Sequence, residues 1–343
     1  MTFPERNPGG SGVYARSLVA AMRDRPDVDV TEIRSRRPGL PNTLSWLARG
    51  ADRRIEESHA QLLHCPSFVV PWKVSIPFVV TIFDLSTRRF PKDHPAEWRF
   101  YERWLLPPRV RAAARVIAIS ELTRRDAIQE YGLDPGRIVT IHLGVDRRFL
   151  TTFDAAHVEP GPAPMLLFPG APVARKNLDL VLTAMAAAAP DSLLGRASLQ
   201  ITGAESERFP RYVERIRSLG LAARVRWLGL VPMDQMPTVM RRADVCVYPS
   251  LYEGFGFPPL EAMASGTPVV ASNASCLPEV LGDAALLVDP SDVRGFSRAV
   301  EAVLSTRELR LRLVEAGRRR AATFTWERCA AQTADLYREV LAV

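Results

Sequence analysis

Two glutamates with seven residues between them, Glu253 and Glu261, belong to the stretch PSLYEGFGFPPLE at 249–261. The stretch follows an apolar, β-branched run that predicts a buried strand, and two prolines near its end predict the start of a helix. Gly254 and Gly256 permit a tight turn between them, and the N–H groups at a helix start attract a phosphate. Carboxylates would normally repel a phosphate, and their presence beside one is explained if hydroxyl groups of the same ligand donate hydrogen bonds to them. A sugar linked to a nucleoside diphosphate fits this pattern, and a solvated glycine-rich turn is the alternative.

Two adjacent cations, Arg175 and Lys176, stand just before a helix predicted at 178–188. The helix dipole disfavours cations at that end, and an anionic ligand would remove the conflict. Such cations are the expected electrostatic partners of a leaving diphosphate where no metal ion serves. Gly170 and Gly203 each follow a predicted strand, and we expect both turns to border the same ligand.

Three features of the N-terminal half extend this pattern. Gly10 and Gly12 belong to a predicted glycine loop, NPGGSGVY, that opens a helix at 15–22 and allows close approach of a ligand. His64 and Asp84 end two predicted buried parallel strands, and ligands bind at the carboxyl ends of such strands. They are therefore predicted to line a cleft on the acceptor side. For His64, a packed and hydrogen-bonded structural role is an equal alternative.

Other elements of the N-terminal half are predicted from periodicity. Residues 28–33 alternate like a strand, 42–59 have a helical pattern, and 94–114 form a long helix rich in aromatic residues. Those aromatic side chains either pack on the sheet or contact a lipid headgroup layer, and packing is the preferred interpretation.

Composition indicates a globular protein of about two domains, with 343 residues, 47% hydrophobic and 24% charged. No apolar run approaches the ~20 residues of a membrane span. The four cysteines are far apart in the chain, which predicts reduced thiols and no structural metal. The whole net charge of +7 falls within residues 1–150. A basic surface suits an anionic membrane or a phosphorylated acceptor, or merely reflects an arginine-rich composition. We expect no nucleic-acid partner, since no nucleic-acid motif is present.

Several motifs in order resemble the retaining glycosyltransferases of family 4. The segment EGFGFPPLEA is similar to the paired-glutamate motif of that family, GGSGVY to its GGxGxY loop, and RKN at 175–177 to its RKN motif. The resemblance covers the chain after residue 8. It implies an α/β fold of two Rossmann-like domains facing across a cleft, the GT-B arrangement. The implied domains are an acceptor-side domain at 1–155, whose first strand is missing, and a donor domain at 156–325. A linker at 151–164 joins them, and a helix at 326–343 crosses back to the first domain.

The same resemblance implies roles for the singled-out residues. Glu261 would accept from ribose hydroxyls, Arg175 and Lys176 would neutralise the leaving diphosphate, and Glu253 would face the sugar ring, so that Glu253, Lys176 and Arg175 are the catalytic candidates. Retention of anomeric configuration is implied, with no metal and no cofactor other than the nucleotide-sugar donor. The implied donor-binding residues are Gly10, Gly12, Gly170, Gly203, Gly254, Phe255, Gly256, Phe257 and Glu261.

Three departures from the family pattern qualify the resemblance. Phe83 stands where relatives carry a histidine that reaches the sugar, and Ala171 stands where some carry an arginine. No apolar strand precedes the glycine loop, which predicts either an upstream start codon or an incomplete first sheet.

These observations predict a hexosyltransferase, with mannose as the guessed sugar, acting on a glycan or lipid-linked acceptor in polysaccharide or glycoconjugate synthesis. The expected location is cytoplasmic, with possible peripheral contact at the inner face of the membrane through the basic domain. The alternatives are a nucleotide-sugar-binding protein of the same fold without turnover and, less favoured, a basic scaffold that binds phosphoesters.

Overall fold

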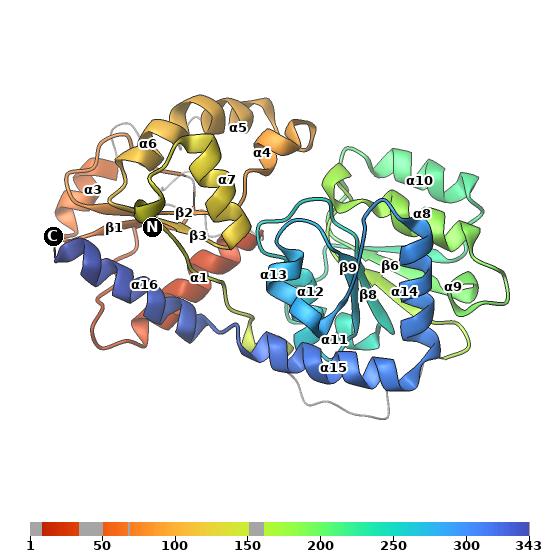
Figure 1. Ribbon diagram of the computed structural model, residues 1–343. Helices are drawn as coiled ribbons and strands as arrows, with labels where there is room; N and C mark the ends of the chain where they lie inside the picture. The colour runs from red at the N-terminus through yellow and green to blue at the C-terminus, as the bar shows by residue number, and fades with distance from the viewer. Residues whose placement is uncertain (1–8, 34–50, 68, 151–160, 343) are drawn as a thin grey trace. The chain divides into compact units, whose positions relative to one another are not determined.

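The computed structural model describes residues 9–33, 51–67, 69–150 and 161–342. The chain divides into two compact units (Figure 1). Unit 1 comprises Met1–Gly144 and Phe324–Val343, and unit 2 comprises Val145–Thr323. Most of the predicted linker at 151–164 lies outside the described residues.

Unit 1 is built on a parallel sheet of four strands among its described residues, in the order β1-β2-β3-β4. The sheet is buried because it has helices on both faces, as its nearly continuous apolar strands predict. Figure 1 shows α1 (Gly10–Arg23) and α16 (Trp326–Leu341) on one face of the sheet and α6 (Leu106–Ala112) and α7 (Glu121–Tyr131) on the other. The strands are β1 (Leu63–Cys65), β2 (Phe78–Ile82), β3 (Arg115–Ala118) and β4 (Ile138–Thr140).

The final helix of the chain, α16, belongs to unit 1 and packs on α1. It begins where the side chain of Thr325 accepts a hydrogen bond from the N–H of Arg328. The backbone of Thr325 and Trp326 passes so close to Gly144 that a Cβ on this glycine would lie 2.3 Å from the backbone nitrogen of Trp326. A glycine is therefore required where the chain leaves unit 1.

Two predicted elements of unit 1 differ from the structure. Residues 28–33 alternate in exposure, but they form no strand with the described residues, so the strand prediction is wrong. The long helix predicted at 94–114 is divided into α5 (Ala96–Phe100), the π-helical turn η3 (Tyr101–Leu105) and α6 (Leu106–Ala112). Pro107 explains the division, because it has no N–H and its ring crowds the carbonyl one turn earlier, which favours a wider turn.

The remaining helices of unit 1 are short. Part of the helix predicted at 42–59 is present as α3 (Ala51–Glu57), and 42–50 lie outside the described residues. The side chain of Ser120 caps α7, and Gly132 ends it in a left-handed conformation. The other helical segments are α4 (Ser86–Arg89), η2 (Pro91–Asp93), α7 (Glu121–Tyr131) and η4 (Pro135–Arg137).

Unit 2 contains a parallel sheet of six strands in the order β10-β9-β8-β5-β6-β7. The chain adds β6 and β7 on one side of β5 and then returns to add β8, β9 and β10 on the other. The order therefore reverses between β5 and β8, and in such sheets ligands bind beyond the carboxyl ends of the strands at this point. The strands are β5 (Met165–Phe168), β6 (Ser198–Thr202), β7 (Val225–Gly229), β8 (Val245–Tyr248), β9 (Val269–Ser272) and β10 (Leu286–Val288).

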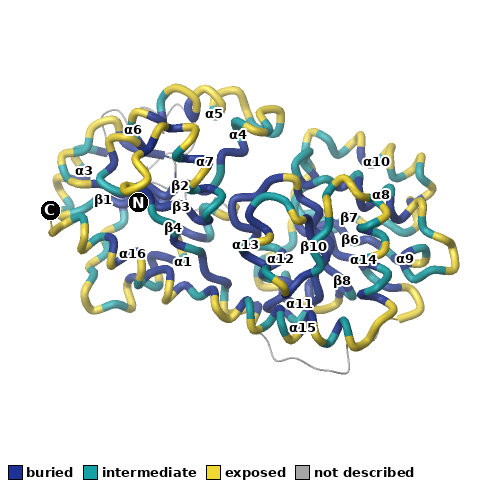
Figure 2. The backbone as a smooth tube through the Cα atoms, viewed as in Figure 1, coloured by how far each residue is buried: buried dark blue, intermediate teal, exposed yellow. Residues whose placement is uncertain are grey.

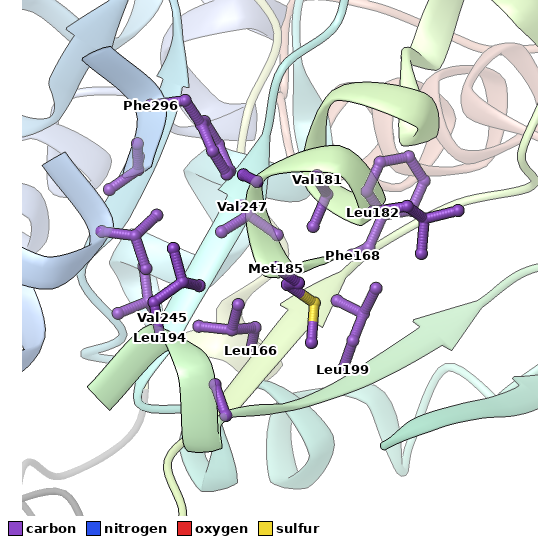
Figure 3. Close-up of a cluster of buried hydrophobic side chains, with 14 of the residues drawn as sticks. Leu166, Phe168, Val181, Leu182, Met185, Leu194, Leu199, Val245, Val247 and Phe296 are labelled. Atoms are coloured by element: carbon purple, nitrogen blue, oxygen red, sulfur yellow. The ribbon is translucent and has the colours of Figure 1, made fainter. Parts of the chain in front are cut away.

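The central strands of unit 2 are anchored in a hydrophobic core that they share with α8 and α14. Figure 3 shows Val245 and Val247 of β8 beside Leu166 of β5, with Phe296 of α14 above them. This packing fixes the strand ends that carry the polar residues. The helical segments of unit 2 are η5 (Arg147–Phe149), η7 (Ala174–Lys176), α8 (Leu178–Ala187), α9 (Leu193–Arg196), α10 (Phe209–Ser218), α11 (Met236–Arg242), α12 (Phe257–Ala264), α13 (Leu277–Leu281), η8 (Gly282–Ala284), α14 (Val293–Ser305) and α15 (Arg307–Ala322).

Candidate active site

The loops that follow β5 and β8 bring Arg175, Lys176 and Glu253 together. The ammonium nitrogen of Lys176 lies 2.6 Å from Oε1 of Glu253, and Nη1 of Arg175 lies 2.9 Å from the same oxygen. Lys176 and Glu253 are each only 7% exposed. The sequence did not predict that two cations share one carboxylate oxygen, because the cations and the carboxylate are more than seventy residues apart.

Buried charges need partners, and the pKa of Glu253 reflects this cluster. Burial alone would raise the pKa of this carboxyl, but the charges of Arg175 and Lys176 outweigh burial and lower it to about 2. Glu253 is therefore ionised at every pH at which an enzyme works. Two cations against one anion leave one positive charge in the cluster, which suits a diphosphate.

Three residues that the sequence did not single out hold this cluster in place. Asn177, in a left-handed conformation with φ of 58°, donates from its amide to the carbonyls of Pro249 (3.2 Å) and Pro290 (2.8 Å). It therefore ties the loop after β5 to the loops after β8 and β10. Asparagine tolerates this conformation better than other non-glycine residues, and its place after the two cations is the one sequence signal that could have indicated this role.

Tyr248 and Ser275 support the cluster from two sides. Lys176 donates a hydrogen bond to the Tyr248 hydroxyl, and its ammonium lies 4.3 Å from the centre of the tyrosine ring. The Ser275 hydroxyl accepts from the N–H of Glu253 (2.8 Å) and donates to the carbonyl of the same residue (2.7 Å). Ser275 adopts φ of 64°, which is strained for a serine and is common at functional sites.

Glu261, the second glutamate of the motif, has the opposite electrostatic environment. It lies in α12, is partly buried and, unlike Glu253, forms no ion pair with any described cation. Burial, with a smaller contribution from the charge of Asp146, raises its pKa to about 8, and Arg148 opposes the shift. Glu261 is therefore mostly protonated at neutral pH when no ligand is bound.

Two glycines in these loops have conformations that only glycine adopts readily. Gly203 has φ of 100°, and a Cβ there would lie 2.3 Å from the backbone nitrogen of Ala171. Gly256 has φ of 91° at the N-terminus of α12, where a Cβ would lie 2.8 Å from the side chain of Leu277. Both glycines thus allow a close backbone approach at the carboxyl edge of the sheet.

The other predicted donor residues of unit 2 lie in the same loops. Gly170 also has a positive φ, 112°, and the side chain of Lys176 lies beside it. Gly254 is buried. Phe255 is buried with its ring edge-to-face on Phe257, which is half-buried, at 5.4 Å. Packing therefore occupies the Phe255 side chain, so we expect it to serve a ligand through its backbone.

The predicted glycine loop of unit 1 is instead part of a helix. Gly10 and Gly12 lie in the first turn of α1, so the expected helix start at 15 is wrong by five residues. The carbonyl of Gly9 accepts from the N–H groups of Gly12 and Val13, and this closes the turn in spite of the glycines. Gly10 is exposed and Gly12 is buried.

His64 belongs to a buried hydrogen-bonded chain in unit 1. Its Nε2 lies 2.8 Å from the Thr81 hydroxyl and its Nδ1 lies 2.5 Å from the Tyr337 hydroxyl, while Tyr14 lies 3.0 Å from Thr81. Burial lowers the pKa of His64 to about 3, so the ring is neutral. These contacts match the structural alternative. A contact between His64 and an acceptor remains a prediction that would require one of these hydrogen bonds to open.

Phe83 and Asp84 follow β2, and their side chains lie in different surroundings. Asp84 is half-buried, and its carboxylate accepts from the N–H of Ser86, the first residue of α4. The Phe83 ring is buried and lies edge-to-face on Tyr14 at 5.3 Å. An aromatic residue that packs in the core thus stands at the position where the family resemblance implies a polar histidine.

No group of three or more His, Cys, Asp or Glu side chains in the part of the chain that the structure describes has the arrangement of a metal site. No helix in the same part of the chain is both long enough and apolar enough to span a bilayer. The four cysteines are buried free thiols.

Comparisons with known proteins agree with this architecture. Residues 8–149 match the family model described as Glycosyltransferase Family 4, and residues 151–320 match that of Glycosyl transferases group 1. The chain is 32% identical over 286 residues to the O-antigen chain mannosyltransferase B of Escherichia coli, covering 81% of this chain and 74% of that protein. It is 28% identical to the alpha-maltose-1-phosphate synthase of Mycolicibacterium smegmatis, covering 99% and 98%.

Solved structures share the fold at low identity. The sucrose-phosphate synthase of Thermosynechococcus elongatus matches with a TM-score of 0.78 and 22% identity, covering 97% of this chain and 94% of that one. HepE of Anabaena, in complex with UDP and glucose, matches with a TM-score of 0.77 and 18% identity, covering 98% of each. With two α/β units of Rossmann type, the family matches identify the chain as a glycosyltransferase of group 1 with the GT-B fold.

Proposed function

We propose that this glycosyltransferase moves a hexosyl group, mannose by preference, from a nucleotide sugar to a glycan or lipid-linked acceptor with retention of anomeric configuration. The observation that carries the proposal is the cluster at the carboxyl ends of β5 and β8, where Arg175 and Lys176 converge on Glu253. A cluster with one excess positive charge at a topological switch point suits the diphosphate of such a donor.

The donor would bind to unit 2. Its diphosphate would meet Arg175, Lys176 and the N-terminus of α12, and its ribose hydroxyls would donate to Glu261. Glu253 would keep the two cations in place and face the sugar. As the bond from the sugar to the diphosphate breaks, negative charge grows on the departing oxygen, and the two cations stabilise it without a metal ion. Retention requires the acceptor oxygen to bond to the anomeric carbon from the face that the diphosphate leaves, and the proton of the acceptor hydroxyl would pass to the departing diphosphate oxygen on that face.

The names of relatives support the sugar and the acceptor class. Two relatives that are 32% and 31% identical are named mannosyltransferases, and one of these names refers to an O-antigen chain. The Anabaena structure with UDP and glucose supports a nucleoside diphosphate in the donor position. We infer polysaccharide or glycoconjugate synthesis, with the acceptor on unit 1 beside His64 and Asp84, at the inner face of the membrane.

The test is release of nucleoside diphosphate by the purified full chain in the presence of a chelator, across donors that include GDP-mannose and UDP-glucose. We expect one preferred donor, loss of release in Lys176→Ala, and unchanged release in Lys73→Ala, a matched control whose side chain is 83% exposed. NMR of the glycosylated product would then give the anomeric configuration, and inversion would refute that part of the proposal.

A second function, donor binding without turnover, is favoured by one observation, the buried Phe83 in place of a polar residue. Tight donor binding with no release for any glycan or lipid-linked acceptor would support this second function. Absence of binding to every donor would refute both.

A further inference from the structure

The helical segment formed by α5, η3 and α6 presents apolar side chains to solvent along its length. Every fourth residue from 96 to 112 is exposed and none of them is polar. Phe100 and Trp104 expose 60% and 62% of their surface. In Figure 2 most of α5 is coloured as exposed residues. The apolar stripe consists of Ala96, Phe100, Trp104, Pro108 and Ala112.

The π-helical turn keeps this stripe on one side of the segment. A spacing of four residues drifts around an α-helix of 3.6 residues per turn, so five such positions would spiral away from one face. The wider turn at η3 (Tyr101–Leu105) compensates for the drift in the middle of the segment. The π-helical turn, which the sequence did not predict, therefore helps to hold the apolar residues on the exposed side of the segment.

The opposite side of the segment already supplies its contribution to the core. Tyr101, Leu106 and Val110 are buried in the hydrophobic cluster of unit 1, and Trp98 packs against it. A surface helix normally carries polar residues on its outer side. The outer apolar stripe is thus not needed to fold unit 1, and exposed apolar patches of this kind mark interaction sites.

The charges that border the stripe indicate which partner it fits. Arg99 and Arg103 directly precede the two exposed aromatic residues and are themselves exposed. The Arg103 guanidinium lies 5.6 Å from the centre of the Trp104 ring, and neither arginine forms an ion pair with another described residue. Glu102, in contrast, is buried and accepts from Tyr131, so it does not offset these charges at the surface. Glu97 is exposed, but the exposed Arg99, Arg103 and Arg111 outnumber it.

We propose that this stripe and its two arginines dock unit 1 on an anionic lipid bilayer. Aromatic rings beside arginines along a helix suit the headgroup layer, where the rings enter the interface and the guanidinium groups meet lipid phosphates. The confinement of the whole net charge of +7 to residues 1–150 agrees with this partner. The proposal deepens the proposed function, on which its link to a lipid-linked acceptor rests.

Vesicle sedimentation of the full chain tests the docking. We expect binding to phosphatidylcholine vesicles that contain phosphatidylglycerol, weak binding to phosphatidylcholine alone, and loss of binding at high salt. The double variants Phe100→Ser/Trp104→Ser and Arg99→Glu/Arg103→Glu should each weaken partition roughly tenfold or more. Their melting temperatures and donor hydrolysis should match those of wild type, because all four side chains are exposed.

Two control variants carry the same changes on unit 2. Leu230→Ser removes an apolar side chain that is 69% exposed, and Arg294→Glu/Arg298→Glu reverses two exposed arginines four residues apart on α14. Both should bind vesicles like wild type. The proposal is overturned if wild type does not bind anionic vesicles, if these controls lose binding equally, or if the stripe variants keep it. Vesicle binding without any donor turnover would refute the proposed function alone.

Discussion

The pKa of Glu261 predicts that donor affinity rises with pH. Burial raises this pKa to about 8, so at pH 7 only about one molecule in ten carries the carboxylate. If ribose hydroxyls donate to the carboxylate, the donor binds the deprotonated form of Glu261, which is the minor form at pH 7. Deprotonation then reduces the binding free energy by ~1.4 kcal/mol at pH 7. The association constant should therefore rise by up to tenfold per pH unit below pH 8 and level off above it.

Calorimetric titration of the intact nucleotide sugar between pH 6 and pH 9 measures this dependence around the pKa of about 8. The diphosphate diester of such a donor does not itself titrate in this range. The total gain should approach a hundredfold if only the carboxylate binds. Binding should also release a proton, which is detected by repeating the titration in buffers of different ionisation enthalpy.

Three variants separate Glu261 from other titrating groups. Glu261→Gln resembles the neutral carboxyl, so its affinity should be independent of pH and close to that of wild type at pH 6. Asp146→Asn removes a charge that raises the pKa of Glu261 and should move the transition to lower pH. Glu102→Gln is the matched control in unit 1, since burial raises the pKa of Glu102 to about 7. A flat profile in wild type, or a wild-type slope in Glu261→Gln, would refute the reasoning.

The same carboxyl should lower the stability of the unliganded protein as pH rises. Its pKa is about 8 in the folded state against the usual 4.5, so the folded state binds the proton more tightly than the unfolded state. Stability contributed by this group is therefore present below pH 4.5 and is lost as pH rises towards 8. We expect Glu261→Gln to raise the melting temperature at pH 8 while it weakens donor binding.

Two further substitutions test how the site is supported. Tyr248→Phe keeps the ring under Lys176 but removes the tyrosine hydroxyl, and it should lower kcat roughly tenfold with little change in donor affinity. The control Val247→Ala in the same strand should lower the free energy of unfolding by about 2 kcal/mol and leave kcat unchanged. Gly203→Ala should lower the free energy of unfolding by ~3 kcal/mol or more, because the new Cβ would overlap a backbone nitrogen. Gly220 has φ of 70° and no atom within 4 Å of an added Cβ, so Gly220→Ala should lower it by only about 1 kcal/mol in thermal unfolding. Equal losses in the two glycine variants would contradict the overlap argument, and a Tyr248→Phe enzyme with wild-type kcat would exclude its role in positioning Lys176.

The strands of unit 2 could be predicted because their signal is local. Strands such as β5 and β8 are short apolar runs next to prolines, and burial on both faces requires such runs. The strand–loop–helix order around the glutamate motif is confirmed for the same reason, since β8, the glycine turn and α12 follow each other within twenty residues. The two-unit GT-B fold followed from these local patterns and the family resemblance.

The failures in unit 1 have non-local or steric causes. Residues 28–33 have the alternation of a strand, but a strand needs a partner, and alternation does not provide one. The helix predicted at 94–114 has a suitable pattern throughout, yet Pro107 imposes a wider turn in the middle. The glycine loop was expected from its composition, whereas the Gly9 carbonyl can close a helical turn across glycines.

The two glutamates of the motif show the limit of sequence reasoning at the site itself. Residue type and spacing make Glu253 and Glu261 equivalent, but their environments lower one pKa to about 2 and raise the other to about 8. The difference comes from Arg175 and Lys176, which form ion pairs with Glu253 and lie more than seventy residues away from it in sequence. At neutral pH the unliganded site therefore combines two cations, one carboxylate and one neutral carboxyl, and a diphosphate meets a net positive charge. Pairs of carboxyls with divergent pKa values have divided roles, so Glu253 should hold the cations permanently while Glu261 changes its protonation state as the donor binds.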